Sequence, residues 1–417
     1  MKLHINLISI IAVLASIMLL NVCDKPKPSD KSNISSIIQN EAKKTAPSRL
    51  KVNTEKEVTF YPTYGYREEG GWNIHLRGWV HKNREHLNKF VTRLASVKDK
   101  CNGLEMNNFQ SRSDDFEDDD KALETVIIKF DSDPDDKPYQ FKKSRSDGIV
   151  QQGLVLTEQK AKELLEKQNS TNGWLTFRAV SKEHTGLGRI RLIEPEGVSL
   201  ISDIDDTIKV TDVPAGRDIV LRNTFCLDFK SAPDMAKMYA DLGDVSVHYI
   251  SGGPEQLFGP LYDFLITGPG GFPEGTFHLK FFPKNLLSGE TSRNLKRFVD
   301  SSLDVTYTHK IKEITSLMER FPQRQFILVG DSGEIDPEVY SEIKRKRPNQ
   351  VKEIWIRDVI NDAGSDANPY RLEGMRIIKV DPTVCVGADH FKNLSLKMNQ
   401  VYAGRSYKRN TAPPCDK

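Results

Sequence analysis

The sequence predicts an α/β domain with a parallel sheet, preceded by a mainly antiparallel β domain. Short β-branched apolar runs predict the parallel sheet, because strands buried on both faces are apolar along their whole length. Segments in which apolar and polar residues alternate, with turn residues between them, predict the antiparallel domain. At 417 residues the chain is long enough for two domains and a tail, which we place at residues 56–195, 196–381 and 382–417.

Strands of the β domain are predicted where the alternation is clearest, at residues 61–66, 72–80, 122–130, 173–180 and 189–193. Helical patterns are expected at residues 87–100 and 157–168. Acidic clusters at residues 114–120 and 131–136 interrupt this domain, and we expect them to be solvated loops between strands. The alternative is that these oxygen-rich loops bind Ca²⁺ at a membrane surface.

Polar side chains follow the apolar runs of the second domain at the points where the predicted strands end. Asp203 and Asp205 follow the strand at 198–202, Ser251 and Gly252 follow the strand at 245–250, and Asp331 follows the strand at 325–329. In open α/β sheets, ligands bind at the carboxyl ends of the strands. Carboxylates placed there can hold a divalent metal on hard oxygens, or one can attack phosphorus while the other transfers protons.

Two further residues fit such a site. Lys310 stands at the head of a helical pattern before the last of these strands, and Asp336 follows Asp331 by five residues. A phosphate monoester is doubly negative, so an attacking carboxylate needs charge neutralisation, which Lys310 and Mg²⁺ can supply. Each residue also has a structural alternative: Lys310 as a surface lysine, Ser251 and Thr207 as turn residues, and Asp336 as a helix N-cap.

The order Asp-x-Asp-x-Thr, Ser, Lys, paired acids resembles the haloacid-dehalogenase-like phosphohydrolase superfamily. Within it, residues 202–209, 321–322, 326–340 and 354–359 resemble the fungal actin-patch phosphatidate phosphatase family, to which bacterial relatives and the lipins are similar. The resemblance covers residues 56–381. It implies a haloacid-dehalogenase-like Rossmannoid catalytic domain and a Mg²⁺-dependent phosphatase for a phosphomonoester lipid. The implied reaction is phosphatidate to diacylglycerol and phosphate.

The resemblance also implies a role for each motif residue. Asp203 is the expected nucleophile, which forms an aspartyl-phosphate, and Asp205 the expected proton donor and acceptor, with Thr207 in the same motif. The expected metal ligands are Asp203, the Asp205 main-chain carbonyl and Asp331. The remaining site residues are the expected phosphate-binding Ser251, Gly252 and Lys310, and Asp336, which is expected to support Lys310 or the metal waters.

The first 22 residues form a predicted secretory signal, with a basic start and an apolar stretch. The signal resembles that of a bacterial lipoprotein, in which Cys23 carries the lipid, and residues 23–55 read as a flexible tether. The alternative is an uncleaved membrane anchor. We therefore expect an exported, membrane-anchored protein in the periplasm or at the cell surface, with a phospholipid substrate and a membrane surface as partners.

Composition narrows the function further. A net charge of +2, from 60 basic and 58 acidic side chains, argues against a dedicated nucleic-acid binder. Besides Cys23, an even number of cysteines remains (Cys101, Cys226, Cys385 and Cys415), which suits disulfides in an oxidising compartment. A Cys385–Cys415 pair could pin the tail, although all these thiols could also be free. Alternative functions are hydrolysis of another lipid or soluble phosphomonoester, or non-catalytic binding of lipid or a partner.

Overall fold

The computed structural model describes residues 56–82, 95–280, 303–363, 366–381, 383–402, 406–409 and 411–415. The predicted signal segment, Cys23 and the tether to residue 55 lie outside this range. Within the described residues, no helix has the length and apolar character needed to cross a bilayer.

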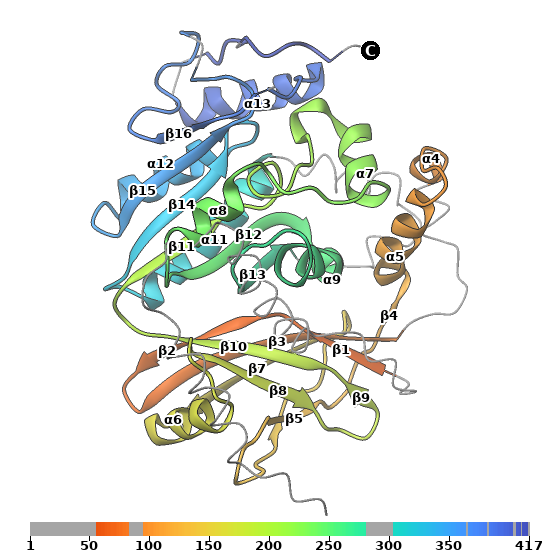
Figure 1. Ribbon diagram of the computed structural model, residues 1–417, viewed down its shortest axis with the longest axis vertical. Helices are drawn as coiled ribbons and strands as arrows, with labels where there is room; N and C mark the ends of the chain where they lie inside the picture. Colours follow the sequence, from red (N-terminus) through yellow and green to blue (C-terminus); the bar gives the residue numbers. More distant parts are fainter. Residues whose placement is uncertain are drawn as a thin grey trace, which may run out of the picture. The chain divides into compact units, whose positions relative to one another are not determined.

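The N-terminal half is built on a mixed, mainly antiparallel sheet (Figure 1). Its strands are β1 Lys56–Phe60, β2 Thr63–Glu68, β3 Gly71–Lys82, β4 Asp119–Asp120, β5 Ile127–Phe130, β6 Tyr139–Gln140, β7 Ile149–Leu156, β8 Trp174–Ala179, β9 His184–Thr185 and β10 Leu187–Ile193. They are ordered β6-β5-β8-β10-β2-β3-β1-β9, and β4 and β7 also pair with β3. Among the described strands of this sheet, only the pairs β1–β9 and β2–β10 are parallel. The expected mainly antiparallel sheet is thus confirmed.

Helix α6 (Glu158–Lys167) confirms the helix predicted at 157–168. It begins where the side chain of Thr157 accepts a hydrogen bond from the N–H of Lys160, which satisfies one free donor of the first turn. Its buried residues Ala161 and Leu164 pack in one core with strand residues of the sheet such as Ile74. The helix therefore closes one face of the β domain.

The first acidic cluster is not a solvated loop, and that prediction is wrong. Residues 114–117 are the last turn of helix α5 (Glu105–Glu117), and the side chain of Asp118 is buried against His81. The helix forms because Phe109 and Phe116 lie two turns apart and are both buried in the core. Of the helix predicted at 87–100, the described part contains only the short helix α4 (Ala95–Lys98).

The second half contains a fully parallel sheet, as the apolar runs predicted. Its strands are β11 Val198–Ser202, β12 Ser246–Pro254, β13 Gly275–Lys280, β14 Gln325–Asp331, β15 Val351–Asp358 and β16 Arg376–Lys379. They are ordered β13-β12-β11-β14-β15-β16, with parallel pairing throughout. The first strand, β11, thus lies between β12 and β14, where the direction of strand addition reverses. Ligands of doubly wound sheets bind at such a reversal.

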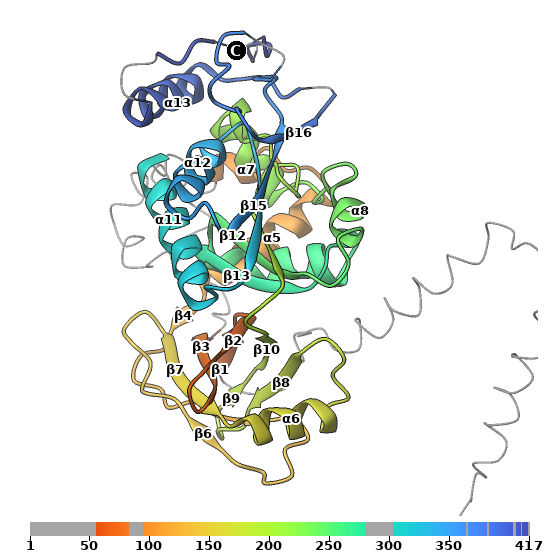
Figure 2. The ribbon, with the colours of Figure 1, turned by 90° about the vertical axis from the view of Figure 1, so that its left-hand side faces the viewer.

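Both faces of this sheet are covered, which explains why its central strands β11 and β14 have apolar residues on both faces. Leu200 of β11 and Ile327 of β14 pack into the core on one face, whereas their neighbours Ile201 and Leu328 pack into the core on the other. Figure 2 shows α11 and α12 on one side of the sheet and α8 on the other. The helices of this half are η1 Val213–Ala215, α7 Arg217–Phe225, α8 Met235–Ala240, η2 Glu255–Leu257, α9 Phe258–Tyr262, η3 Asp263–Thr267, α11 Leu303–Arg320, α12 Asp336–Lys346 and α13 Ala388–Val401.

Two disulfides join segments that are distant in sequence. Cys385–Cys415 closes the C-terminal segment, as considered from the sequence, and helix α13, which the sequence did not predict, lies between the two cysteines. Cys101–Cys226 joins the segment between α4 and α5 to the end of α7. Helix α5 therefore packs in the same core as α7, although it precedes the β domain's later strands in the chain.

Candidate active site

Asp203 is the centre of the site predicted from the sequence. It follows β11 directly, its side chain is 2% exposed, and Oδ1 lies 2.8 Å from Lys310 Nζ. The hydroxyl of Thr207 donates to its second oxygen, Oδ2, at 3.1 Å. Both carboxylate oxygens are thereby fixed, and Thr207 contacts the candidate nucleophile rather than only closing a turn.

Lys310 is buried in the middle of α11, not at the head of a helix. The helix begins at Leu303, because Leu303 and Tyr307 extend its apolar face toward the N-terminus. Lys310 Nζ contacts Asp203 and, at 2.5 Å, Asp336 Oδ1. Burial alone would lower the pKa of Lys310, but the two carboxylates raise it well above its ordinary value. The surface-lysine alternative is therefore wrong, and the site contains a fixed positive charge.

Asp331 ends β14, next to β11, and is fully buried. Its Oδ1 accepts hydrogen bonds from the N–H groups of Gly333 at 2.7 Å and Glu334 at 3.2 Å. Its Oδ2 accepts a hydrogen bond from Thr207 at 3.4 Å. The adjacency of β11 and β14 thus brings Asp203 and Asp331 to one point.

Asp336 lies at the start of α12 but does not cap it. The N-cap position is Ile335, with no side-chain capping bond, and the Asp336 carboxylate turns back to contact Lys310 and the N–H of Asp331 at 3.3 Å. Oxygens of Asp203, Asp331 and Asp336 lie within 4.8 Å of one another and could hold a metal ion. The structure therefore groups the side chain of Asp336, rather than that of Asp205, with the other two acids.

The carboxylate of Asp205 points to a different set of partners. Its Oδ1 accepts hydrogen bonds from Lys209 Nζ at 2.8 Å and from the hydroxyl of Thr211 at 2.6 Å. Burial would raise the pKa of Asp205, but Lys209 and these hydrogen bonds lower it below its ordinary value. The sequence analysis missed both partners, although Lys209 directly follows the acidic motif.

Ser251 and the glycines after it lie beside Asp205. The hydroxyl of Ser251 donates to Asp205 Oδ2 at a long 3.5 Å and accepts a hydrogen bond from the N–H of Gly253 at 2.9 Å. A Cβ atom at Gly252 would lie 3.2 Å from the side chain of Thr306, so the chain passes closely over α11 there. Ser251 lies within β12, which extends beyond the predicted strand end, and its hydroxyl lies beside Asp205.

Glu334 is a site residue that the sequence analysis did not name. Burial raises its pKa to about 7, the charge of Lys310 opposes this rise, and Asp336 adds to it. Burial and neighbouring acids also raise the pKa of Asp203 and of Asp331 well above the ordinary value. The acids are crowded around a single lysine, and such crowding favours a bound divalent cation. The signal available in the sequence was the Gly333–Glu334 pair directly after Asp331.

The comparisons with known proteins agree with this geometry. Residues 198–358 match the family model described as phosphatidate phosphatase APP1, catalytic domain. This segment is thus similar to the catalytic domain of APP1-type phosphatidate phosphatases. The phosphatidate phosphatase APP1 of Saccharomyces cerevisiae is 36% identical over 170 residues, which is 40% of this chain and 26% of the yeast protein.

A second relative is an uncharacterised protein of Schizosaccharomyces pombe, 26% identical over 184 residues, covering 42% of this chain and 27% of that protein. The chain thus spans about a quarter of the length of these curated relatives. Among solved structures, a GH2 β-galacturonidase from Eisenbergiella tayi superposes with a TM-score of 0.23 and 9% identity, over 86% of this chain and 55% of that one. The segment similar to the APP1 catalytic domain contains Asp203, Ser251, Lys310 and Asp331.

Proposed function

We propose that this protein is a Mg²⁺-dependent phosphatidate phosphatase that acts through an aspartyl-phosphate on Asp203. The observation that carries the proposal is the buried Asp203–Lys310 pair beside Asp331 at the reversal of the parallel sheet. The printed name of the yeast relative, phosphatidate phosphatase, supports the substrate class. We also propose that the α/β half is a haloacid-dehalogenase-like domain, since its strand order and the positions of its motif residues fit that class.

The residues present fit a magnesium ion. Asp203, Asp331 and Asp336 offer hard oxygen ligands, and the Asp205 main-chain carbonyl remains a proposed fourth. When bound, Mg²⁺ would neutralise phosphoryl charge and orient the phosphate for in-line attack. Lys310 is a permanent counter-charge for the same group.

The proposed reaction has two steps. In the first, a carboxylate oxygen of Asp203 forms a bond to phosphorus while the bond from phosphorus to the glycerol oxygen breaks. Asp205, whose pKa the bound doubly negative phosphate raises again, gives its proton to that oxygen. In the second, Asp205 takes a proton from a water molecule, whose oxygen bonds to phosphorus while the bond from phosphorus to Asp203 breaks, which releases inorganic phosphate. Ser251 and the N–H of Gly252 would donate hydrogen bonds to phosphoryl oxygens.

Lys209 and Thr211 have a supporting part in this scheme. They hold Asp205 Oδ1, which leaves Oδ2 on the side of Ser251. The oxygen that faces the phosphate-binding residues is thus the one free to exchange a proton with substrate or water.

The test measures phosphate release from phosphatidate in mixed micelles with Mg²⁺, with water-soluble phosphate esters in parallel. We expect Asp203→Asn to lower the rate by at least about 10³-fold, whereas Asp218→Asn, whose side chain is 74% exposed, keeps the full rate. Acid quenching with ³²P-labelled substrate should trap label on the wild-type chain but not on Asp203→Asn.

Each other outcome identifies what is wrong. Equal rates in wild type and Asp203→Asn would refute the mechanism. Hydrolysis of soluble esters without hydrolysis of phosphatidate would refute the substrate class. No hydrolysis of any ester would favour a non-catalytic lipid- or partner-binding protein.

We further propose that the protein is exported and anchored at a membrane through a lipid on Cys23. The two disulfides support export, because such bonds persist in oxidising compartments. Mass spectrometry of the protein from its native membrane should find a lipidated Cys23 at the mature N-terminus, and Cys23→Ser should release the protein from the membrane. An unmodified N-terminus with residues 1–22 still attached would favour the uncleaved anchor.

A further inference from the structure

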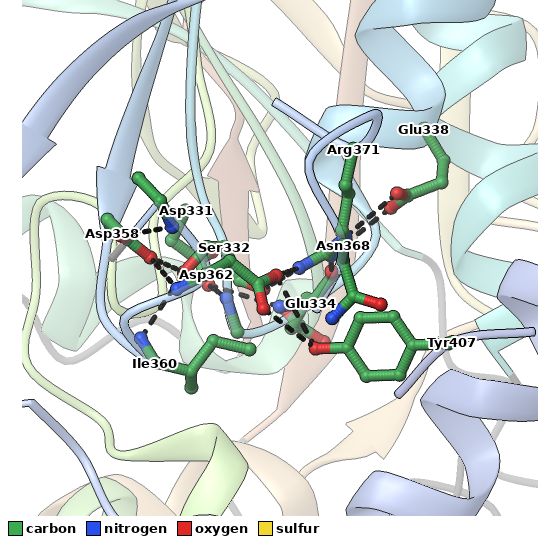
Figure 3. A network of polar contacts seen from close by, with 12 residues as sticks. Asp331, Ser332, Glu334, Glu338, Asp358, Ile360, Asp362, Asn368, Arg371 and Tyr407 are labelled. Atoms are coloured by element: carbon green, nitrogen blue, oxygen red, sulfur yellow. Dashed lines mark hydrogen bonds and ion pairs between the residues drawn. The ribbon is translucent and has the colours of Figure 1, made fainter. Parts of the chain in front are cut away.

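The loop that follows β14 is held from outside the APP1-type segment. Its three consecutive carbonyl groups, of Ser332, Gly333 and Glu334, all accept hydrogen bonds from side chains beyond residue 358. Arg371 donates to Ser332 at 2.6 Å and also to Glu334, and His390 Nε2 lies 2.6 Å from the oxygen of Gly333. Figure 3 shows Arg371 between this loop and the acids that pair with it.

Two peptide groups of this loop are held at both ends. The group that joins Ser332 to Gly333 donates its N–H to Asp331 Oδ1 at 2.7 Å and accepts from Arg371 at its carbonyl. The next group donates the N–H of Glu334 to the same oxygen and accepts from His390. Since a peptide group is planar, fixing its carbonyl fixes the direction of its N–H. Hydrogen bonds in such chains also strengthen one another.

Arg371 is itself held in place. It is fully buried, and its Nε donates to Glu338 Oε1 at 2.9 Å while its Nη1 pairs with Asp362. Tyr402 donates to Glu338 at 3.2 Å and Tyr407 to Asp362 at 3.1 Å, which completes the network with residues of the C-terminal segment. A buried cation with two carboxylate partners and two backbone acceptors has a single stable orientation.

We propose that Arg371 and His390 are positioning residues that orient the Asp331 carboxylate for metal binding through the two peptide groups between them. Neither side chain touches the reacting atoms. Their hydrogen bonds fix Asp331 Oδ1, and Oδ2 is left to face Thr207 and the metal position. This inference rests on the metal site of the proposed function, and it makes the C-terminal segment part of the working site.

The test measures binding of Mn²⁺, an EPR-visible stand-in for Mg²⁺, by the full-length protein in the absence of substrate. His390→Phe keeps an aromatic ring but removes the bond to Gly333, and Arg371→Lys keeps the charge that Glu338 and Asp362 need but removes the fork. We expect both variants to bind Mn²⁺ about 10-fold or more weakly, as is typical when a partner of a metal ligand is lost. Lys392→Met is the matched control, because Lys392 is an exposed residue of the same helix as His390 and lies outside this network, and its affinity should stay within about twofold of wild type.

Wild-type Mn²⁺ affinity in a folded His390→Phe variant would overturn the proposal, since that change removes no buried charge. So would a wild-type protein that binds no Mn²⁺, or whose binding is unaffected by Asp331→Asn. The proposal and the proposed function can fail separately. If the wild-type protein hydrolyses no ester but His390→Phe still binds Mn²⁺ more weakly than wild type, the proposal holds and the proposed function fails.

Discussion

Lys310 Nζ lies 2.8 Å from Asp203 Oδ1, and both side chains are almost fully buried. The same nitrogen lies 2.5 Å from Asp336 Oδ1. One lysine therefore pairs with two carboxylates, one from the first motif and one from the last. A charge held this firmly can meet a phosphoryl group without reorganising, which is the condition under which electrostatic catalysis is most effective.

Replacement of Lys310 should therefore affect both activity and stability. We expect Lys310→Met to lower phosphate release by about 10²–10³-fold. It should also lower the free energy of unfolding by about 3–5 kcal/mol, because two buried carboxylates lose their partner. Steady-state kinetics and urea unfolding check the two effects.

Lys312→Met is the control for that variant, since Lys312 lies on the same helix with its side chain 79% exposed. We expect its rate to equal that of wild type and its unfolding free energy to change by less than about 0.5 kcal/mol. A Lys310→Met enzyme with the wild-type rate would contradict the assigned role.

The antiparallel sheet contacts the end of β12 through Arg77 and Glu255. Arg77 donates to both carboxylate oxygens of Glu255, at 2.7 and 2.8 Å, and Glu255 directly follows the last residue of β12. Burial raises the pKa of Glu255, and Arg77 opposes the rise. Arg77→Met should lower the free energy of unfolding by about 3–5 kcal/mol, because the buried Glu255 carboxylate loses its ion-pair partner, and Arg77→Met/Glu255→Gln should recover most of the loss.

A double-mutant cycle from urea unfolding measures this coupling. Arg67→Met is the control on the same sheet, because the Arg67 side chain is 40% exposed and forms ion pairs with Glu158 and Glu194. We expect it to lower the free energy of unfolding by less than about 1 kcal/mol. If Arg67→Met and Arg77→Met lower the free energy of unfolding equally, the buried Arg77–Glu255 pair contributes no more to stability than the exposed pairs of Arg67.

The Cys385–Cys415 disulfide spans a sequence separation of 30 residues that includes His390. By the loop-closure model, the Cys385→Ser/Cys415→Ser variant should lose about 3–4 kcal/mol of unfolding free energy. The Cys101–Cys226 bond spans 125 residues, and the matching double variant should lose about 4–5 kcal/mol. Alkylation of the unreduced protein should modify none of these cysteines, whereas labelling of any of them would show that the pair is open.

The strands of the parallel sheet could be predicted from the sequence, but several side-chain partners could not. Strands β11, β12 and β14 have apolar residues on both faces, so they could be recognised as buried strands in the sequence. The polar residues at the ends of these strands then indicated the candidate site. The orientation of Asp205 was not accessible, because it depends on contacts with Lys209 and Thr211 rather than on chain spacing.

Elements stabilised by distant contacts were also missed. Helix α5 has an acidic end typical of a loop, yet Phe109 and Phe116 are buried against Phe225, which is far along the chain. The sequence around Arg371 likewise does not indicate that this side chain is buried in a network. Its partners Ser332, Glu338 and Asp362 lie beside it only in the folded protein. The sequence identified the acids and the lysine that meet at the strand ends, whereas the residues that hold them were set by tertiary packing.

The second acidic cluster contacts a lysine. Lys160 Nζ lies 2.5 Å from Asp133 Oδ1 and 2.6 Å from Asp135 Oδ2, and the Asp133 side chain is 1% exposed. The cation at these carboxylates is therefore Lys160 of helix α6, which argues against the Ca²⁺ alternative. Burial would raise the pKa of Asp133, but hydrogen bonds from Lys160 and two backbone N–H groups lower it below its ordinary value of 3.8.

This pair should make the β domain sensitive to acid. Because the pKa of Asp133 is lower in the folded than in the unfolded chain, its contribution to stability is fully present above pH 3.8 and is lost as the pH falls further. We expect Lys160→Met to be less stable than wild type by a constant amount between pH 5 and 7, and the gap to narrow below about pH 4. Urea unfolding at a series of pH values measures the gap. Lys162→Met, at a side chain that is 76% exposed, should show no gap at any pH, and a Lys160→Met gap unchanged down to pH 3 would exclude Asp133 as its source.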